Sequence, residues 1–426
     1  MQHQLMQAVG RLMRATAATV CVVAALAACG GGGGPAAVPL PPPTPNQVPV
    51  TVEQFNPNNP VPNRPYVTVT VCDAQNNCQD VDHVLLDTGS TGLRIMPGVL
   101  RLSLPAQQNA DGSVVAECMQ YGAGYFWGAQ RLATVKMAGE IAPNIAVTVA
   151  GDPSIPAAAP AGCASSMPNA IAGLPQFNGI LGIGPQKTDC GASCEQSTAA
   201  QLYFACQGGA AGSCTAVTMP VAQQTSNPIS QFASDNNGSV LTFPAVGTPQ
   251  DRVVGTLTFG IGTQSNNTVK GLQIYRSSVP NLDFPLLAAT VNGVSSFAFL
   301  DTGTSFYHLA QTGGATVLTR PPFVQAISGL AVCGQPGGPY CPAAPQSVQI
   351  RLNGSNGNPT SWQTVTLADP TAAFQANQAV IPTLGMQNND SPGVSILGLP
   401  FYFGRTVATA IDGMPTPGGA GPYWAF

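Results

Sequence analysis

Two aspartates in the sequence stand in the same local context. Asp87 and Asp301 each follow an apolar run and each begin an Asp-Thr-Gly motif. Two buried carboxyls brought within about 3 Å of each other cannot both ionise, because desolvation and like charge both oppose it. They share a proton, so one can act as general base on a water while the other donates to a substrate carbonyl. This chemistry would hydrolyse a peptide bond without a metal or a covalent intermediate.

The residues after each aspartate suit a supporting role. Glycine lets backbone N–H groups face a carboxylate, and hydroxyl groups can donate hydrogen bonds to it. A single Asp-Thr-Gly is a weak signal, whereas two copies in a repeated frame are a strong one. The predicted supporting residues are Thr88, Gly89 and Ser90 in the first motif, and Thr302, Gly303 and Thr304 in the second.

The two motifs belong to an internal repeat. Residues 84–91 recur as residues 298–305, and an Ile-Leu-Gly sequence follows each copy. Gly182 lies 95 residues after Asp87, and Gly398 lies 97 residues after Asp301. Two motifs in the same order at nearly the same spacing indicate a duplicated chain.

The elements that must position these motifs read as strands. The apolar run before each aspartate is typical of a buried strand, and Thr-Gly then turns the chain. Each Ile-Leu-Gly predicts another short buried strand, and residues 132–137 alternate between apolar and polar. With 48 Gly and 40 Pro and no long amphipathic pattern, we expect an all-β protein of two related lobes, over residues 61–265 and 266–426.

The motifs resemble those of the pepsin-like aspartic proteases, and also uncharacterised proteobacterial lipoproteins that carry them. Residues 87–90 and 301–304 match the two active-site signatures of the protease family, and residues 177–184 and 396–402 match the segments that close its lobes. The likeness spans residues 65 to 415. It implies a bilobal fold with one Asp-Thr-Gly loop per lobe, a peptide or protein substrate bound between the lobes, and no cofactor.

The resemblance also implies a flap, a hairpin that closes over the substrate. Residues 120–124 match it and make Tyr121 and Gly122 its substrate-binding residues, although the aromatic residues at 125–127 leave simple hairpin packing as an alternative. Where the family has Leu-Trp-Val, with a Trp that braces the flap tyrosine, this chain has Arg94 in place of the Trp. The departure keeps a second hypothesis open: a catalytically silent lipoprotein of this fold that binds peptide, glycan or an envelope partner.

The first residues read as an export signal. Arg11 and Arg14 precede a short apolar run, which predicts a signal peptide over residues 1–28. The sequence Leu-Ala-Ala-Cys then resembles a lipoprotein box with Cys29 as the lipidated residue; the alternative is an ordinary secretory signal cut nearby. Residues 29–60 would form the lipid anchor and a Gly/Pro-rich tether. We expect a lipid-anchored protein of the bacterial cell envelope, on the outer membrane facing the periplasm or the exterior, with no membrane contact besides the lipid.

Ten of the twelve cysteines remain once Cys21 and Cys29 are set aside, an even number that suits an oxidising compartment. No CxxC pair or nearby His accompanies them, so we predict no metal site. The sequence alone leaves the connectivity open. Short spacings suggest disulfides between 72 and 78, 206 and 214, and 333 and 341, with 190 to 194 also possible, which would leave 118 and 163 for each other.

Composition excludes other classes. With 44% hydrophobic and 8% charged residues the chain is globular, and a net charge of −4 with no run of Lys or Arg excludes nucleic-acid binding. No Gly-x-Ser-x-Gly elbow and no phosphate-binding glycine loop occurs. Because the aspartate pair needs both lobes locked together, we expect a monomer.

Overall fold

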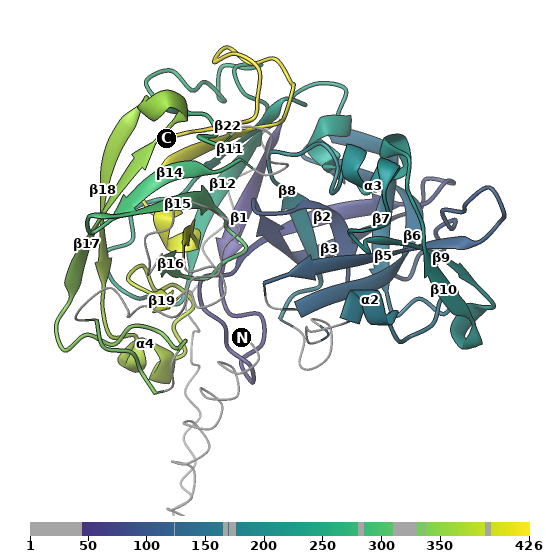
Figure 1. Ribbon diagram of the computed structural model, residues 1–426, viewed down its shortest axis with the longest axis horizontal. Coiled ribbons are helices and arrows are strands. Elements are labelled where there is room, and N and C mark those ends of the chain that lie inside the picture. The colour runs from purple at the N-terminus through teal and green to yellow at the C-terminus, as the bar shows by residue number, and fades with distance from the viewer. Residues whose placement is uncertain are drawn as a thin grey trace, which may run out of the picture.

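The computed structural model describes residues 45–122, 124–164, 169, 176–279, 285–309, 330–334, 337–387 and 393–426. Strands make up most of the elements and the helices are short, which confirms the all-β, bilobal fold class. Strands β5 to β10 lie in one lobe and β14 to β19 in the other, with β1 between them (Figure 1). Over these ranges no helix is both long and apolar enough to cross a bilayer. The signal peptide and Cys29 lie outside the described residues.

A sheet of fifteen described strands runs through both halves of the chain, in the order β10-β9-β5-β6-β7-β4-β8-β3-β2-β1-β12-β11-β21-β22-β13. Strand β1 pairs with β2 on one side and β12 on the other, and β11 pairs with β21. The bounds are β1 Gln47–Val52, β2 Pro65–Cys72, β3 Cys78–Asp87, β4 Thr91–Ile95, β5 Val114–Tyr121, β6 Gly124–Met137, β7 Glu140–Ala150, β8 Gly179–Ile183, β9 Tyr203–Gln207, β10 Ser213–Ala216, β11 Gly238–Thr242, β12 Val253–Phe259, β13 Ile274–Tyr275, β21 Thr406–Ala410 and β22 Tyr423–Ala425.

A second sheet, of seven described strands, has the order β18-β17-β14-β15-β20-β16-β19. Its strands are β14 Leu287–Val291, β15 Val294–Leu300, β16 Tyr307–Leu309, β17 Gln346–Asn353, β18 Thr360–Leu367, β19 Gly385–Gln387 and β20 Val394–Leu397. The described α-helices are α2 Ala161–Ala164, α3 Ala192–Gln196 and α4 Thr371–Gln375; the 3₁₀ helices are η1 Gly209–Ala211, η2 Val221–Gln223, η3 Pro228–Gln231, η4 Ser355–Gly357 and η5 Leu399–Tyr402.

Strand β1 corrects one sequence expectation. The sequence predicts a tether over residues 29–60, yet residues 47–52 form a strand in which Val50 and Val52 are completely buried. Three valines at alternate positions, 48, 50 and 52, put apolar side chains on one face of a strand, and that face packs into the core. The remaining domain boundaries stay predictions.

The sequence repeat has a counterpart in the topology. Strand β3 pairs in parallel with β8, and β4 pairs with β8 on its other side. Strands β15, β20 and β16 repeat this arrangement in the second half. Glycine is required in β8 because a Cβ at Gly182 would lie 2.5 Å from the backbone nitrogen of Thr91. Each aspartate therefore leaves its strand directly beside an Ile-Leu-Gly segment.

Disulfides join the ten cysteines of the described part, and they settle the connectivity that the sequence left open: four bonds link close neighbours, and the fifth links the two cysteines that remain. The pairs are Cys72–Cys78, Cys118–Cys163, Cys190–Cys194, Cys206–Cys214 and Cys333–Cys341. The bond between residues 118 and 163 ties β5 to α2, across 45 residues of chain.

Candidate active site

The two Asp-Thr-Gly loops meet and hold each other through reciprocal hydrogen bonds. Asp87 is the last residue of β3, and Asp301 directly follows β15. The backbone N–H of Thr88 donates to Oγ1 of Thr302 (3.1 Å), and the N–H of Thr302 donates to Oγ1 of Thr88 (3.0 Å). These bonds join residues 214 positions apart, so each lobe fixes the position of the other's loop.

Each carboxylate receives the same two hydrogen bonds from its own motif. Oδ1 of Asp87 accepts from the N–H of Gly89 (2.7 Å), and Oδ2 accepts from the hydroxyl of Ser90 (2.5 Å). In the second loop Gly303 and Thr304 donate to Asp301 in the same way, at 2.7 and 2.6 Å. The supporting hydrogen bonds that the sequence predicted are therefore present in both loops.

The glycines show how closely the two carboxyl groups approach. A Cβ at Gly303 would lie 2.8 Å from Oδ1 of Asp87 and 3.1 Å from Oδ1 of Asp301, so both oxygens surround one point. A Cβ at Gly89 would lie 2.7 Å from Oδ1 of Asp301. Each carboxyl thus packs against the glycine of the opposite motif. The structure brings the predicted pair together; that the pair is catalytic remains a prediction.

The pKa of Asp301 is shifted by its burial beside Asp87. Burial, the negative charge of Asp87 and a hydrogen bond between the two carboxyls raise the pKa of Asp301 well above its usual value. The hydrogen bonds from Thr304 and Gly303 act in the opposite direction and are outweighed. Asp301 therefore holds a proton at pH values where an isolated carboxyl is ionised, which is the coupled behaviour expected of such a pair.

Two residues that the sequence did not single out support the loops. The hydroxyl of Tyr402 lies 3.0 Å from Oγ1 of Thr88. Arg64, just before β2, is buried, and its Nη1 donates to the carbonyl of Gly303 (2.7 Å). Burial lowers the pKa of Arg64, while the charges of both aspartates favour its protonated form. An arginine before a proline carries no sequence signal that would have revealed this role.

Tyr121 ends β5 and pairs with Gly124, which begins β6, so the predicted flap is a hairpin. Gly122 is exposed, and a Cβ there would have no neighbour within 4 Å. Burial raises the pKa of Tyr121, and the nearby charge of Asp87 adds to that shift, so the phenol lies near the first loop. The neighbouring Phe126 and Trp127 pack into the core, whereas Tyr121 is only half-buried. A substrate-binding role for Tyr121 and Gly122 stays a prediction.

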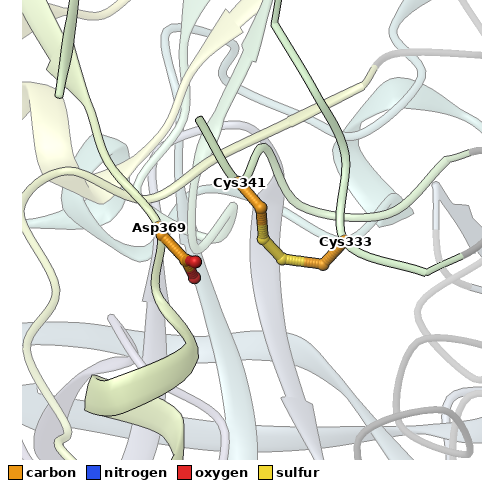
Figure 2. Close-up of side chains that lie close together, drawn as sticks. All are labelled: Cys333, Cys341 and Asp369. Carbon is orange, nitrogen blue, oxygen red and sulfur yellow. A yellow bond between two sulfur atoms is a disulfide. The ribbon is translucent and has the colours of Figure 1, made fainter. Parts of the chain in front are cut away.

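One cluster in the described residues has metal-ligand chemistry. Cys333, Cys341 and Asp369 place their ligand atoms within 4.8 Å of one another. Figure 2 shows that the two sulfurs are joined in a disulfide beside the carboxylate. Because the disulfide consumes both thiolates, the cluster offers a metal only one carboxylate.

Comparisons with known proteins place the fold and the family. The structure is similar to a crystal structure of an aspartic proteinase from Irpex lacteus, with a TM-score of 0.55, 16% identity, and coverage of 89% of this chain and 96% of that one. At this identity the similarity shows the pepsin-like fold alone. No curated protein sequence matches the chain. A family model matches residues 42–426, so the chain belongs to the family described as protein of unknown function DUF3443.

Proposed function

We propose that the protein is an aspartic endopeptidase that hydrolyses peptide bonds with a water activated between Asp87 and Asp301. The observation that carries the proposal is the mutual contact of the two loops, in which each carboxyl lies against the opposite glycine. With the proton on Asp301, the pair has one acid and one base. Asp87 takes a proton from the water as it attacks the carbonyl carbon, and Asp301 donates to the carbonyl oxygen.

The hydrogen bonds around the pair support this division of labour. Gly89 and Ser90 donate to Asp87 and keep its carboxylate oriented, while Gly303 and Thr304 do the same for Asp301. Such preorganisation contributes to catalysis because the groups need not move during the reaction. The tyrosine at the end of β5 would close over an extended peptide.

The decisive experiment incubates the full-length protein, purified in detergent, with unfolded casein between about pH 3 and 7, where coupled carboxyl pairs titrate. We expect cleavage that both Asp87→Asn and Asp301→Asn abolish, and that the transition-state mimic pepstatin inhibits. Cleavage unaffected by both variants would come from a contaminant and would remove the claim. Peptide binding without turnover would favour the silent binding protein instead.

The proposal places the enzyme in the bacterial cell envelope, anchored through a lipid on Cys29. Five disulfides in the described residues support an oxidising compartment. Incorporation of labelled palmitate that Cys29→Ala abolishes would support the anchor, and unlabelled wild-type protein would refute it.

A further inference from the structure

Arg94 is a charged side chain with no exposed surface. It lies in β4, three residues after Thr91, between the Asp87 loop and β5. Burying a guanidinium costs free energy unless its charge is balanced and its N–H groups are bonded. The groups that balance the charge of Arg94 and bind its N–H groups therefore indicate the role of this residue.

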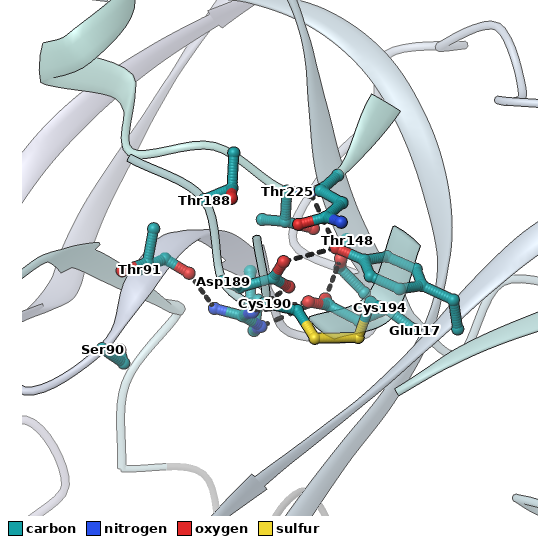
Figure 3. A network of polar contacts seen from close by, with 12 residues as sticks. Ser90, Thr91, Glu117, Thr148, Thr188, Asp189, Cys190, Cys194 and Thr225 are labelled. Atoms are coloured by element: carbon teal, nitrogen blue, oxygen red, sulfur yellow. Dashed lines mark hydrogen bonds and ion pairs between the residues drawn. A yellow bond between two sulfur atoms is a disulfide. The ribbon is translucent and has the colours of Figure 1, made fainter. Parts of the chain in front are cut away.

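Two acidic side chains from distant parts of the chain hold the guanidinium (Figure 3). Glu117 of β5 accepts from Nη2 (2.5 Å) and Nε (3.1 Å) through its two oxygens, and Asp189 lies 3.4 Å from Nη2. Nη1 donates to the carbonyl of Thr91 (2.8 Å). Thr148 of β7 donates to Glu117, which fixes the carboxylate from its other side. The orientation of the guanidinium plane is thus set by a two-pronged contact with β5.

The charges of this buried group balance only when one carboxyl is protonated. Burial, followed by the hydrogen bond and charge of Glu117, raises the pKa of Asp189 well above its usual value. Burial also acts to raise the pKa of Glu117, but the charge of Arg94 and its hydrogen bonds lower it. One positive and one negative charge remain. The hydroxyl of Tyr203 donates to Oδ1 of Asp189 (2.5 Å) and completes the group.

The guanidinium connects the flap tyrosine with the Asp87 loop. Its central carbon lies 5.9 Å from the centre of the Tyr121 ring, within the range of a cation–π contact. Glu117 stands four residues before Tyr121 on the same strand. The Thr91 carbonyl that Nη1 binds adjoins Ser90, whose hydroxyl donates to Asp87. Arg94 therefore interacts both with the ring of Tyr121 and with the backbone that follows the Asp87 loop.

We propose that Arg94 is a positioning residue that holds the ring of Tyr121 beside the Asp87 loop. The inference rests on the proposed function, since it concerns the same site. A planar guanidinium can form hydrogen bonds through the N–H groups at its edge while its face packs against an aromatic ring. A lysine ammonium has no such plane, so it cannot bind both oxygens of Glu117, donate to Thr91 and face the ring at the same time. The two acids serve to fix that plane.

The test compares Arg94→Lys with Arg131→Lys in the full-length protein. Arg131 is a matched control because it also forms a two-pronged contact with a carboxylate, that of Asp152 (2.8 and 2.6 Å), and lies on β6 of the same hairpin. We expect Arg94→Lys to lower kcat/KM for casein about tenfold, as loss of a desolvated cation–π contact would. Amide exchange of Met119 and Tyr121 should quicken, and Arg131→Lys should change neither.

A double variant separates positioning from general support. In a Tyr121→Leu background, Arg94→Lys should cause no further loss of kcat/KM, because its target ring is gone. Independent losses that multiply, or unchanged exchange in β5, would overturn the proposal. Should Arg94→Lys not fold, Glu117→Gln serves instead, because it keeps the guanidinium and weakens its two-pronged contact with residue 117. Unchanged amide exchange of β5 in Glu117→Gln would also overturn the proposal. If wild-type protein cleaves nothing, the proposed function fails, while the exchange data still decide whether Arg94 holds Tyr121.

Discussion

Each aspartate of the site depends on the glycine of the opposite motif. Gly303 lies against the carboxyl of Asp87, and Gly89 lies against that of Asp301. Neither glycine has a positive φ, so the requirement for glycine comes from the carboxyl neighbour rather than from the backbone. A methyl group at either position would move a carboxyl that two hydrogen bonds hold in place.

Gly303→Ala should therefore impair catalysis while leaving the fold intact. The added Cβ, 2.8 Å from Cγ of Asp87, must displace that carboxyl, and a misplacement of this kind lowers kcat/KM about a hundredfold. Gly247→Ala is the control, since nothing lies within 4 Å of a Cβ there. Casein cleavage and the thermal unfolding midpoint would be measured for both. Equal activity of the two variants would contradict the close approach of the loops.

The raised pKa of Asp301 gives stability a defined pH dependence. The folded protein binds this proton more tightly than the unfolded chain, whose carboxyl has a pKa of about 4. The stabilising contribution is therefore complete below about pH 4 and is lost as the pH rises through the folded pKa. Asp301→Asn, which stays neutral, should unfold at a higher temperature than wild type near pH 7, with the advantage shrinking toward pH 4.

Asp111 supplies the control of opposite sign. The hydroxyl of Ser113 donates to this exposed carboxylate and lowers its pKa, so its contribution is present above the unfolded pKa and is lost as the pH falls. Asp111→Asn should lower the unfolding midpoint near pH 7 and leave it unchanged at low pH. If both variants shifted the midpoint in the same direction near pH 7, the assigned pKa directions would be wrong.

Strand β5 carries both Tyr121 and Glu117, one of the acids that hold Arg94. Its neighbours β6 and β9 pair along its two edges, and Cys118 ties it to α2. The register of β5 thus places the carboxylate of Glu117 beside the guanidinium of Arg94. Its stability depends on keeping one negative charge beside the guanidinium.

Either acid alone can supply that charge, so the amide variants should not be additive. Asp189→Asn mimics the protonated carboxyl, and in Glu117→Gln the remaining Asp189 can ionise. The double variant leaves the guanidinium buried without a counter-charge, which costs about 3–5 kcal/mol. Denaturant unfolding would measure the losses, with Glu53→Gln in the half-exposed pair with Arg252 as a control expected to cost about 1 kcal/mol or less. Additive losses would contradict a shared proton.

The two halves of the chain are joined by one continuous sheet. Strands β11 and β12, from the first half, lie between β1 and β21, so the sheet has no seam at the predicted boundary near residue 265. The two Asp-Thr-Gly loops then meet across this scaffold through Thr88 and Thr302. The two halves therefore depend on each other structurally. The expected monomer stays a prediction, which sedimentation can test.

Separated halves should fail to fold on their own. A fragment of residues 45–265 keeps β12 but loses β21, the other partner of β11, and so uncovers the edge of the strand that holds the buried Val240 and Leu241. We expect neither this fragment nor residues 266–426 to unfold cooperatively or to cleave casein, and co-refolding of both to restore activity. A first fragment that is monomeric and unfolds in one sharp transition would show that the lobes are independent.

The sequence predicted the aspartate pair, its supporting hydroxyls and glycines and the duplicated topology, and its short cysteine spacings suggested disulfides without fixing their connectivity. These features are local or repeated: strand alternation, turn residues and a motif present twice reveal themselves over a few positions. It placed β1 in the tether although three valines alternate there, because so short a pattern beside a Pro-rich segment does not reveal the pairing with β2 and β12.

Arg64 and the group around Arg94 could be found only in the structure. Glu117 of β5, Thr148 of β7 and Asp189 of the segment between β8 and α3 are far apart in the chain, so no spacing connects them with Arg94. Burial and charge balance are properties of the packed molecule, and they decide which acids ionise. The chain thus specifies its reactive groups by local pattern, while tertiary packing sets their distances and their protonation.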